Sequence, residues 1–446
     1  MIYMKRLVTA LMVFPVMLTA QEQNLSLQKA YELAQQNYPL IKQRDLIKQT
    51  TDYTVDNLSK GFLPQFSLSG QATYQSAVTG VDIPVAGIPF SSVSKSQYKI
   101  LADINQTIYD GGAIKQQKNI QQLNDETEQQ KVEVELYKLK DRINQFFLGV
   151  LFLDEQLKQV DLVKEDLNNG IKRVGAQVDN GVAFKSNLNV LKAELLKADQ
   201  RVIELKSSRK GLIDVLSLFI NQTLPEETML EKPKTDAPFI TNEIQRPELK
   251  LYSTQQKLLG GQFQLIDSRN KPRAGLFLQG GYGKPGLNFL KNEFAFFYTT
   301  GVRLNWSFGG LYTQKNEKKI IELNQKTVDI QKEIFLLNTN TQLRQQLSEV
   351  DKLQKLIASD GEIIDLRIKV KDAAKAQLEN GVITANDYLR EVNAEDQARQ
   401  SLITHQVQLL QAQINYQTIS GKLKTSGYEE IIFCNNSHNI IFDYWM

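Results

Sequence analysis

The sequence has a single cysteine, Cys434, and only two histidines. One cysteine allows no disulfide within the chain and no cysteine-based metal site. The charges nearly cancel to a formal net charge of +3 without a basic block, which argues against a nucleic-acid-binding protein. No Ser/His/Asp arrangement or metal-spaced cluster is present, and His405 lies in a polar helical stretch that predicts a solvated side chain. We therefore expect no catalytic residue, no metal site and no cofactor.

Long apolar runs are also scarce. The run from Leu7 to Leu18 follows Lys5 and Arg6, which predicts a secretory signal peptide over 1–20, cleaved after Ala20. An uncleaved anchor is the alternative, but the run is shorter than the roughly 20 residues of a spanning helix. The next longest run, FFLGVLFL at 146–153, is shorter still. If the mature chain crosses a membrane, it must therefore use strands.

Proline is absent between 90 and 224 and again after 285. Because proline is the strongest helix breaker, these stretches predict long helices. Within 311–375 the apolar residues follow alternating steps of three and four, which is typical of a helix that buries a seam against neighbours. We expect helices over about 25–60, 111–176, 184–222, 242–270, 311–376 and 384–422.

The segments between these helices alternate polar and apolar residues, as in FSLSGQATY at 66–74. This period of two predicts strands over about 62–78, 96–109, 273–283 and 293–308. Their aromatic-rich apolar positions fit a lipid-facing surface, and a soluble sheet packed on a core is the alternative. The opposite, polar face would line a wet lumen with Ser67, Ser69, Gln71, Thr73, Asp103, Asn105, Arg303 and Asn305.

The sequence repeats itself. AQVDNGV at 176–182 recurs as AQLENGV at 376–382, Pro39 and Pro64 recur as Pro247 and Pro272, and GG closes both hairpins at 111–112 and 309–310. We infer two repeats, 21–236 and 237–422, each ordered helix, strand, strand, long helix, turn, helix. The tail 423–446 has no counterpart in the first repeat; an ordered belt and a disordered extension are both compatible with it.

Four strands cannot close a barrel around a pore, and open strand edges are not tolerated in lipid. We therefore expect a homo-oligomer that pools its strands, with the long helices packed side by side in a tube.

The combined features resemble the TolC-type outer-membrane efflux proteins over about residues 25–422. The resemblance implies an α+β membrane protein of two helix-strand-strand-helix repeats. In a homotrimer, four strands per protomer would form one twelve-stranded outer-membrane β-barrel, continued by a long periplasmic α-helical barrel. It further implies a passive exit duct of a tripartite efflux or type I secretion system, in outer-membrane lipid, joined by a periplasmic adaptor to an inner-membrane transporter. A periplasmic coiled-coil adaptor or structural protein without a pore is the alternative.

In that family the turn after each long helix lies at the periplasmic tip, and a glycine is followed by a threonine and an aspartate three and six residues later. The second repeat matches with Gly381, Thr384 and Asp387, whereas Arg390 replaces a further acidic residue. The resemblance thus implies one ring of Asp387 carboxylates at the aperture of a trimer. Capping of the return helix by Thr384 and Asp387 is an alternative that is compatible with this role.

The first repeat keeps only part of this pattern, with Gly181, Phe184 and Asn187 at the matching positions. It has the glycine but lacks the aspartate, so we expect the second repeat to matter more at the aperture. For Gly181 and Gly381 we expect a left-handed backbone that ends one helix before the next begins.

Overall fold

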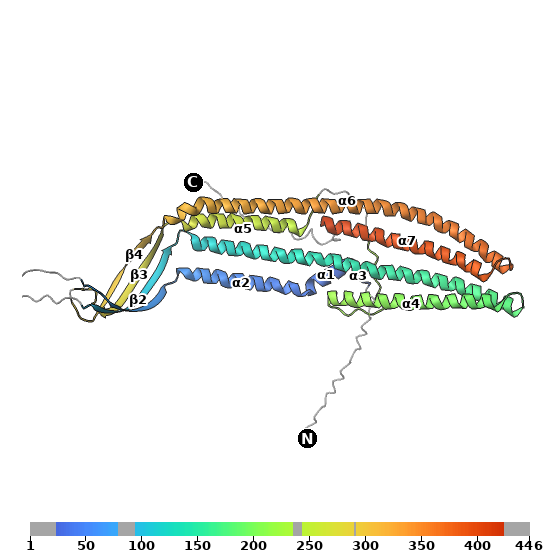
Figure 1. Ribbon diagram of the computed structural model, residues 1–446, viewed down its shortest axis with the longest axis horizontal. Coiled ribbons are helices and arrows are strands. Elements are labelled where there is room, and N and C mark those ends of the chain that lie inside the picture. The colour runs from blue at the N-terminus through green and yellow to red at the C-terminus, as the bar shows by residue number, and fades with distance from the viewer. Residues whose placement is uncertain (1–23, 79–93, 235–242, 290, 423–446) are drawn as a thin grey trace, which may run out of the picture.

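The computed structural model describes residues 24–78, 94–234, 243–289 and 291–422. The predicted signal peptide and the tail 423–446 lie outside the described residues. The described chain is elongated, with a β-sheet at one end and parallel rows of helices that run to the opposite tip (Figure 1). Within the described residues, none of the helices has the length and apolarity required to span a membrane.

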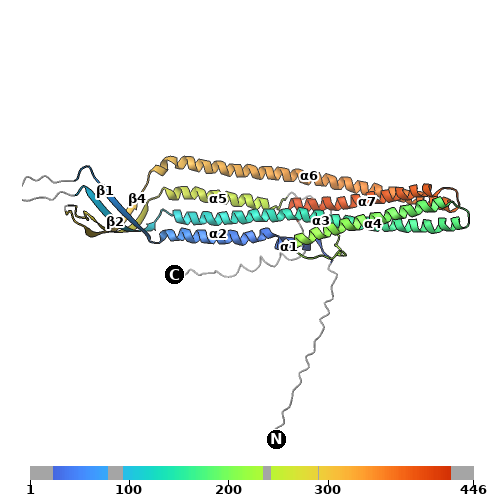
Figure 2. The ribbon, with the colours of Figure 1, turned by 60° about the horizontal axis from the view of Figure 1, so that its bottom comes forward.

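Seven helices are described: α1 (Leu27–Asn37), α2 (Lys42–Ser59), α3 (Ala113–Asp179), α4 (Lys185–Ile220), α5 (Pro247–Arg269), α6 (Gly309–Glu379) and α7 (Ala385–Ser420). At the sheet end, α6, α5, α3 and α2 follow one another across a layer in both views (Figures 1 and 2). Towards the tip, α4 packs against α3 and α7 packs against α6.

The two shorter rows are each built from helices placed end to end (Figure 1). The Gln245 N–H, just before α5, donates to the Ser420 carbonyl at the end of α7 over 2.8 Å. In the other row, the Asn37 side-chain amide at the end of α1 donates to the Ile220 carbonyl at the end of α4, also over 2.8 Å. Each repeat therefore combines one uninterrupted long helix with one row that is divided near its middle.

The helix expected over 25–60 is divided. It consists of α1, a 3₁₀ turn at Pro39–Ile41 and α2. Tyr38 is extended, with ψ 130°, because the ring of a following proline disfavours the helical region and proline supplies no N–H. The Ser26 hydroxyl accepts the Lys29 N–H and caps the start of α1.

The sheet contains β1 (Gln65–Tyr74), β2 (Ser96–Tyr109), β3 (Arg273–Lys284) and β4 (Ala295–Asn305), all antiparallel and in sequence order. The pairing of β2 with β3 joins the hairpin of the first repeat to that of the second. β1 and β4 each pair on one side only, so both edges of the sheet are open among the described residues.

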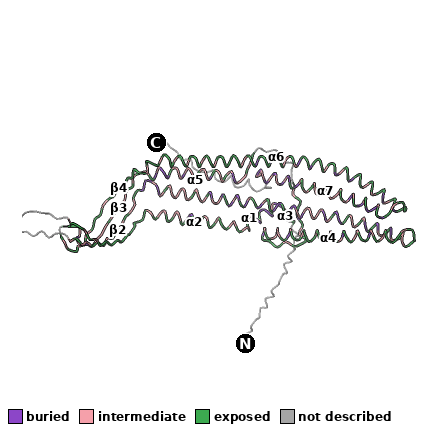
Figure 3. The backbone as a smooth tube through the Cα atoms, in the orientation of Figure 1, coloured by how far each residue is buried: buried purple, intermediate pink, exposed green. Residues whose placement is uncertain are grey.

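The buried core lies among the helices. One cluster, in the middle of the molecule, includes Ile143 and Phe147 of α3, Ile213 of α4 and Ile414 of α7. A second lies nearer the tip and includes Leu167 and Leu191. Figure 3 shows this burial along the helices, whereas β1 and β4 are mostly exposed and β2 and β3 are mostly half-buried. The sheet thus adds no hydrophobic side chain to the buried core among the described residues.

The two GG pairs, which we expected to close both hairpins alike, differ in conformation. Gly111 and Gly112 are left-handed, with φ of 76° and 86°, and precede α3. Gly309 and Gly310 are instead the first residues of α6. The two long helices therefore start differently although the residues are the same.

Candidate channel surface and helical tip

The polar strand residues selected from the sequence lie on one face of the sheet. Antiparallel residues that pair directly project to the same face, and alternate residues along a strand share that face. Ser67 pairs with Asp103, which in turn pairs with Gln279 of β3. The register extends this face over Ser67, Ser69, Gln71 and Thr73 of β1, Asp103 and Asn105 of β2, and Arg303 and Asn305 of β4.

Sequence reasoning missed several members of this polar face. The register adds Gln97, Lys99, Arg273, Gln279 and Thr299. The Gln279 amide donates to the Asp103 carboxylate over 2.6 Å. Alternation in β3 is weak because Gly275, Gly281 and Gly283 occupy the same face, which leaves few polar side chains to detect.

The opposite face is apolar and uncovered. Phe296 and Leu68 are 86% and 77% exposed, and the Tyr282 ring lies 4.5 Å from that of Phe296. A soluble sheet would bury such a face against a core, and no described helix covers it. The aromatic surface is therefore left uncovered by the described part of the chain.

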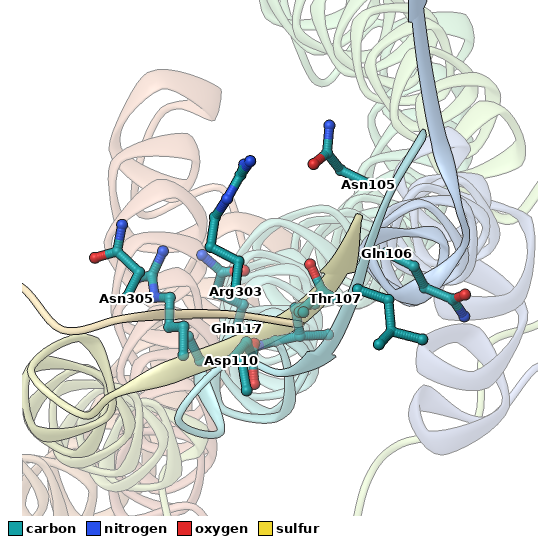
Figure 4. Close-up of a pocket in the computed structure, with 13 residues that line it drawn as sticks. Asn105, Gln106, Thr107, Asp110, Gln117, Arg303 and Asn305 are labelled. Carbon is teal, nitrogen blue, oxygen red and sulfur yellow. The ribbon is translucent and has the colours of Figure 1, made fainter. Parts of the chain in front are cut away.

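A depression of about 330 Å³ lies where the polar face meets the helices. Figure 4 shows Asn105 and Arg303 projecting from one side of the sheet and Gln106 from the other. Arg273 of β3 and Gln117 of α3 also line this depression. The structure therefore groups Asn105, Arg303 and Asn305 around this depression. The other selected strand residues do not line it.

The two turns at the tip have the same backbone. Gly181 and Gly381 have φ of 72° and 68°, and their N–H groups donate to Val178 and Leu378 carbonyls over 3.0 and 3.1 Å. A residue with a β-carbon disfavours this left-handed region, so glycine is the residue that ends both helices here. The repeated NGV motif is thus explained by backbone geometry.

The residues after the turns differ. The Thr384 hydroxyl accepts the Asp387 N–H over 3.3 Å, and the Asp387 carboxylate accepts the Thr384 N–H over 3.1 Å, which completes a capping box. Hydrogen bonds from the Thr384 hydroxyl and backbone, with help from Arg390 at 3.6 Å, lower the pKa of Asp387. The capping alternative is therefore present in the structure.

The first turn has no equivalent cap. Phe184 occupies the N-cap position of α4 without a side-chain hydrogen bond, and its ring is 80% exposed. The Asn187 N–H donates only to the Phe184 carbonyl, over 3.0 Å. The two turns thus share a bend but present different surfaces.

A buried charge network joins the helices above the turns. The Lys371 ammonium lies 2.7 Å from Asp166 of α3 and 2.6 Å from Glu395 of α7, and Arg399 lies 2.7 Å from Glu395. Burial alone would raise the pKa of Glu395, but the hydrogen bonds from Lys371 and Arg399 outweigh it, and the pKa is lowered. Sequence reasoning missed these residues because charged residues on a helix usually face solvent.

The prediction that His405 is solvated is wrong. Its Nδ1 lies 2.6 Å from the Asp360 carboxylate across the contact between α7 and α6, and Asp360 is buried. A buried carboxylate needs a partner, and the imidazole supplies it. His405 is therefore part of the helix packing.

No protein-family model and no curated protein matches the sequence. Solved structures do. The outer membrane protein VceC from Vibrio cholerae matches with a TM-score of 0.62 and 12% identity, over 89% of this chain and 96% of that chain. The chain has the TolC-type fold. The outer membrane channel MtrE of Neisseria gonorrhoeae has the same TM-score at 14% identity, over 89% of both chains. CmeC of Campylobacter jejuni, also an outer membrane channel, has a TM-score of 0.58 at 13% identity, over 90% of this chain and 87% of that chain.

The TolC-type fold accounts for the two-repeat architecture, with a small sheet at one end and paired helices at the other. It confirms the expected α+β fold of long helices and four strands per protomer. The matched proteins are channels rather than enzymes.

Proposed function

We propose that this protein is an outer-membrane exit duct that conducts solutes passively from an adaptor-coupled inner-membrane transporter to the exterior. The observation that carries the proposal is the amphipathic sheet with two open edges. Its aromatic face is exposed, its other face is polar, and no described element of the same chain covers either edge. A strand edge in lipid has to be paired, so further strands must come from other protomers.

A ring of three protomers satisfies this requirement. β4 of one copy would pair with β1 of the next, giving a closed barrel of twelve strands. The helices support the same arrangement, because their outer rows expose apolar side chains at opposite ends of the layer: Leu46 and Tyr53 on α2, Ile203 on α4, and Ile320, Ile330 and Leu337 on α6. Contact between unlike surfaces closes into a ring when the rotation between copies fits.

In this arrangement the aromatic face contacts outer-membrane lipid and the helices extend into the periplasm. The tip exposes Val182, Phe184 and Val382, which are 73%, 80% and 71% exposed. Apolar side chains on an exposed tip support docking of a periplasmic adaptor there. The inner-membrane transporter would supply the energy.

The two turns would surround the periplasmic aperture. Gly181 and Gly381 form the bends, Asn187 and Arg390 lie beside them, and Thr384 holds Asp387 in its cap. One carboxylate per protomer would then face the aperture and favour cations near it. The capping role of Asp387 is compatible with this one, because its carboxylate remains partly exposed.

Membrane fractionation tests the proposal. The expected result is an oligomer in the outer-membrane fraction that resists detergent when cold and dissociates to monomer on heating. In planar bilayers the purified oligomer should give stable conductance steps. A soluble periplasmic monomer would contradict the proposal and favour an adaptor or structural protein. Mild cross-linking in cells should then capture the adaptor and transporter beside the oligomer.

A further inference from the structure

Charge on the polar face of the sheet is unbalanced. The charged residues that the register places there are Lys99, Asp103, Arg273 and Arg303. The only carboxylate among them, Asp103, accepts a hydrogen bond from Gln279 over 2.6 Å. Three cations against one anion leave each protomer with a net positive polar face within the described strands.

The two arginines lie together at the base of the sheet and lack carboxylate partners. Arg273 and Arg303 both line the depression of about 330 Å³, and neither forms an ion pair with a described residue. The acidic side chain among the lining residues, Asp110, accepts the Gly112 and Ile114 N–H groups over 2.9 and 2.6 Å. Its carboxylate therefore caps α3 instead of neutralising the arginines.

The register places three residues of the lining next to one another. Gly275 pairs with Thr107 on one side and Arg303 on the other, and all three line the depression. The Arg303 guanidinium lies over the Phe277 ring, with 4.6 Å between them, which holds it against the sheet. An oriented guanidinium beside an open depression can present its N–H groups to an anion.

We propose that Arg273 and Arg303 form an anion-binding girdle at the base of the barrel lumen, which favours passage of anionic solutes. The inference rests on the proposed function, because it needs the polar face to line a pore. The ligand class is a carboxylate, phosphate or halide, since guanidinium groups bind such anions through paired N–H donors. The girdle faces away from the aromatic surface, so its source of anions is solute rather than lipid headgroups.

The sign of the effect follows from charge rings in pores. Rings of cationic side chains raise the local anion concentration and lower the barrier to anions. A trimer would bring two arginines from each copy to one level of the lumen. The proposed Asp387 ring lies in series with the girdle, so the diagnostic quantity is the change in anion-to-cation permeability ratio when the arginines are neutralised.

The test uses purified full-length oligomer in planar bilayers under a potassium chloride gradient. The variant Arg273→Gln with Arg303→Gln should lower the chloride-to-potassium permeability ratio at least about twofold, whereas Arg273→Lys with Arg303→Lys should keep it. The control Lys29→Gln with Lys210→Gln removes the same charge from exposed positions on α1 and α4, and it should leave the ratio unchanged. The set is repeated in an Asp387→Asn background to remove the second ring.

Inorganic phosphate is the second probe. It should reduce the chloride conductance of the wild type more than that of the glutamine variant. Both effects should persist in bilayers of neutral phosphatidylcholine, which excludes a lipid phosphate as the ligand. An unchanged permeability ratio for the glutamine variant in both backgrounds overturns the girdle, as does an effect seen only with anionic lipid. Heat-labile oligomers without any conductance would contradict the proposed duct itself.

Discussion

The side-chain amide of Gln177, at the end of α3, donates to the main-chain carbonyl of Glu379, at the end of α6, over 3.1 Å. Arg173 forms an ion pair with the Glu379 carboxylate close by. The turns of the two repeats, two hundred residues apart in the sequence, are therefore held side by side in one protomer. The charge network around Lys371 lies just above this contact and strengthens the same junction.

Replacing Lys371 with methionine should destabilise the junction. The change leaves Asp166 and Glu395 without their shared cation, but Arg399 still pairs with Glu395 and Asp166 is partly exposed, so we expect a loss of about 1–2 kcal/mol, below the cost of breaking a fully buried pair. The temperature at which the oligomer dissociates should fall. Lys369→Met, at an exposed position two residues away, is the control and should change little. Equal dissociation temperatures for the two variants would contradict a stabilising role for the network.

The same network predicts how stability depends on pH. The folded-state pKa of Glu395 is lowered, so its contribution is present above the ordinary glutamate pKa and is lost as the pH falls through the lowered value. The dissociation temperature of the wild type should stay constant as the pH falls to the usual pKa range of glutamate, and it should decrease at pH values below that range. Glu395→Gln should flatten this acid limb, and an unaltered limb would show that other groups cause it.

Lys140 predicts a second pH effect, in the alkaline range. Burial, with a contribution from Arg246, lowers the pKa of Lys140 from 10.5 to about 8. Between these values the unfolded chain binds more protons than the folded one, so stability rises with pH there. Lys140→Met should stabilise the protein by about 1–2 kcal/mol at pH 7, because loss of the contact with the Tyr137 ring at 4.5 Å offsets part of the gain.

This gain should fade as the pH rises from about 8 towards 10.5. Dissociation temperatures at pH 7 and pH 10 measure it. A gain of the same size at both pH values would mean that the methionine stabilises by packing alone.

Tyr298 and Thr299 are neighbours in β4 that project to opposite faces of the sheet. Tyr298→Arg would put a charge on the lipid-facing surface, at a cost of about 2–4 kcal/mol if the residue lies near the middle of the bilayer. Thr299→Arg adds the same charge to the polar face and should be tolerated. The yield of heat-labile oligomer in the outer-membrane fraction compares the two. Equal yields would contradict the assignment of the faces.

Asp387→Asn should make the conductance less dependent on which cation is present, because it removes the proposed carboxylate ring at the aperture. Asn187→Asp should increase that dependence by adding a second ring. Since the pKa of Asp387 is lowered, the wild-type behaviour should persist at pH values below the usual aspartate range. Single-channel recordings in sodium and potassium salts measure both variants. Unchanged conductance in both would leave Asp387 with its capping role alone.

Much of this architecture could be predicted because its signals are local. Alternation identified the strands, and the NGV motif located both turns, since each depends on a few neighbouring residues. The break at Pro39 has an equally local signal, although the helix expected over 25–60 ran through it. Gln279 gives only a weak signal of alternation, because Gly281 and Gly283 follow it on the same face of β3.

The missed parts depend on contacts between distant segments. Lys371 looks like an ordinary surface lysine until α3 and α7 are placed on either side of it. His405 looks solvated until Asp360 is placed opposite it. The conformations of the two GG pairs differ for a similar reason, because identical residues meet different neighbours where α3 and α6 begin. A single sequence does not show which distant residues come into contact.

At the end-to-end junctions of α4 with α1 and of α7 with α5, the path of the chain does not affect the length of the helical layer. The chain enters and leaves the helical layer at these seams, through 221–234 in one case, without interrupting α3 or α6. Extra residues inserted at a seam would extend an external loop while the distance from sheet to tip stays fixed by the two unbroken helices. The seams are therefore the positions where inserted segments can add new surface while the helical layer keeps its structure.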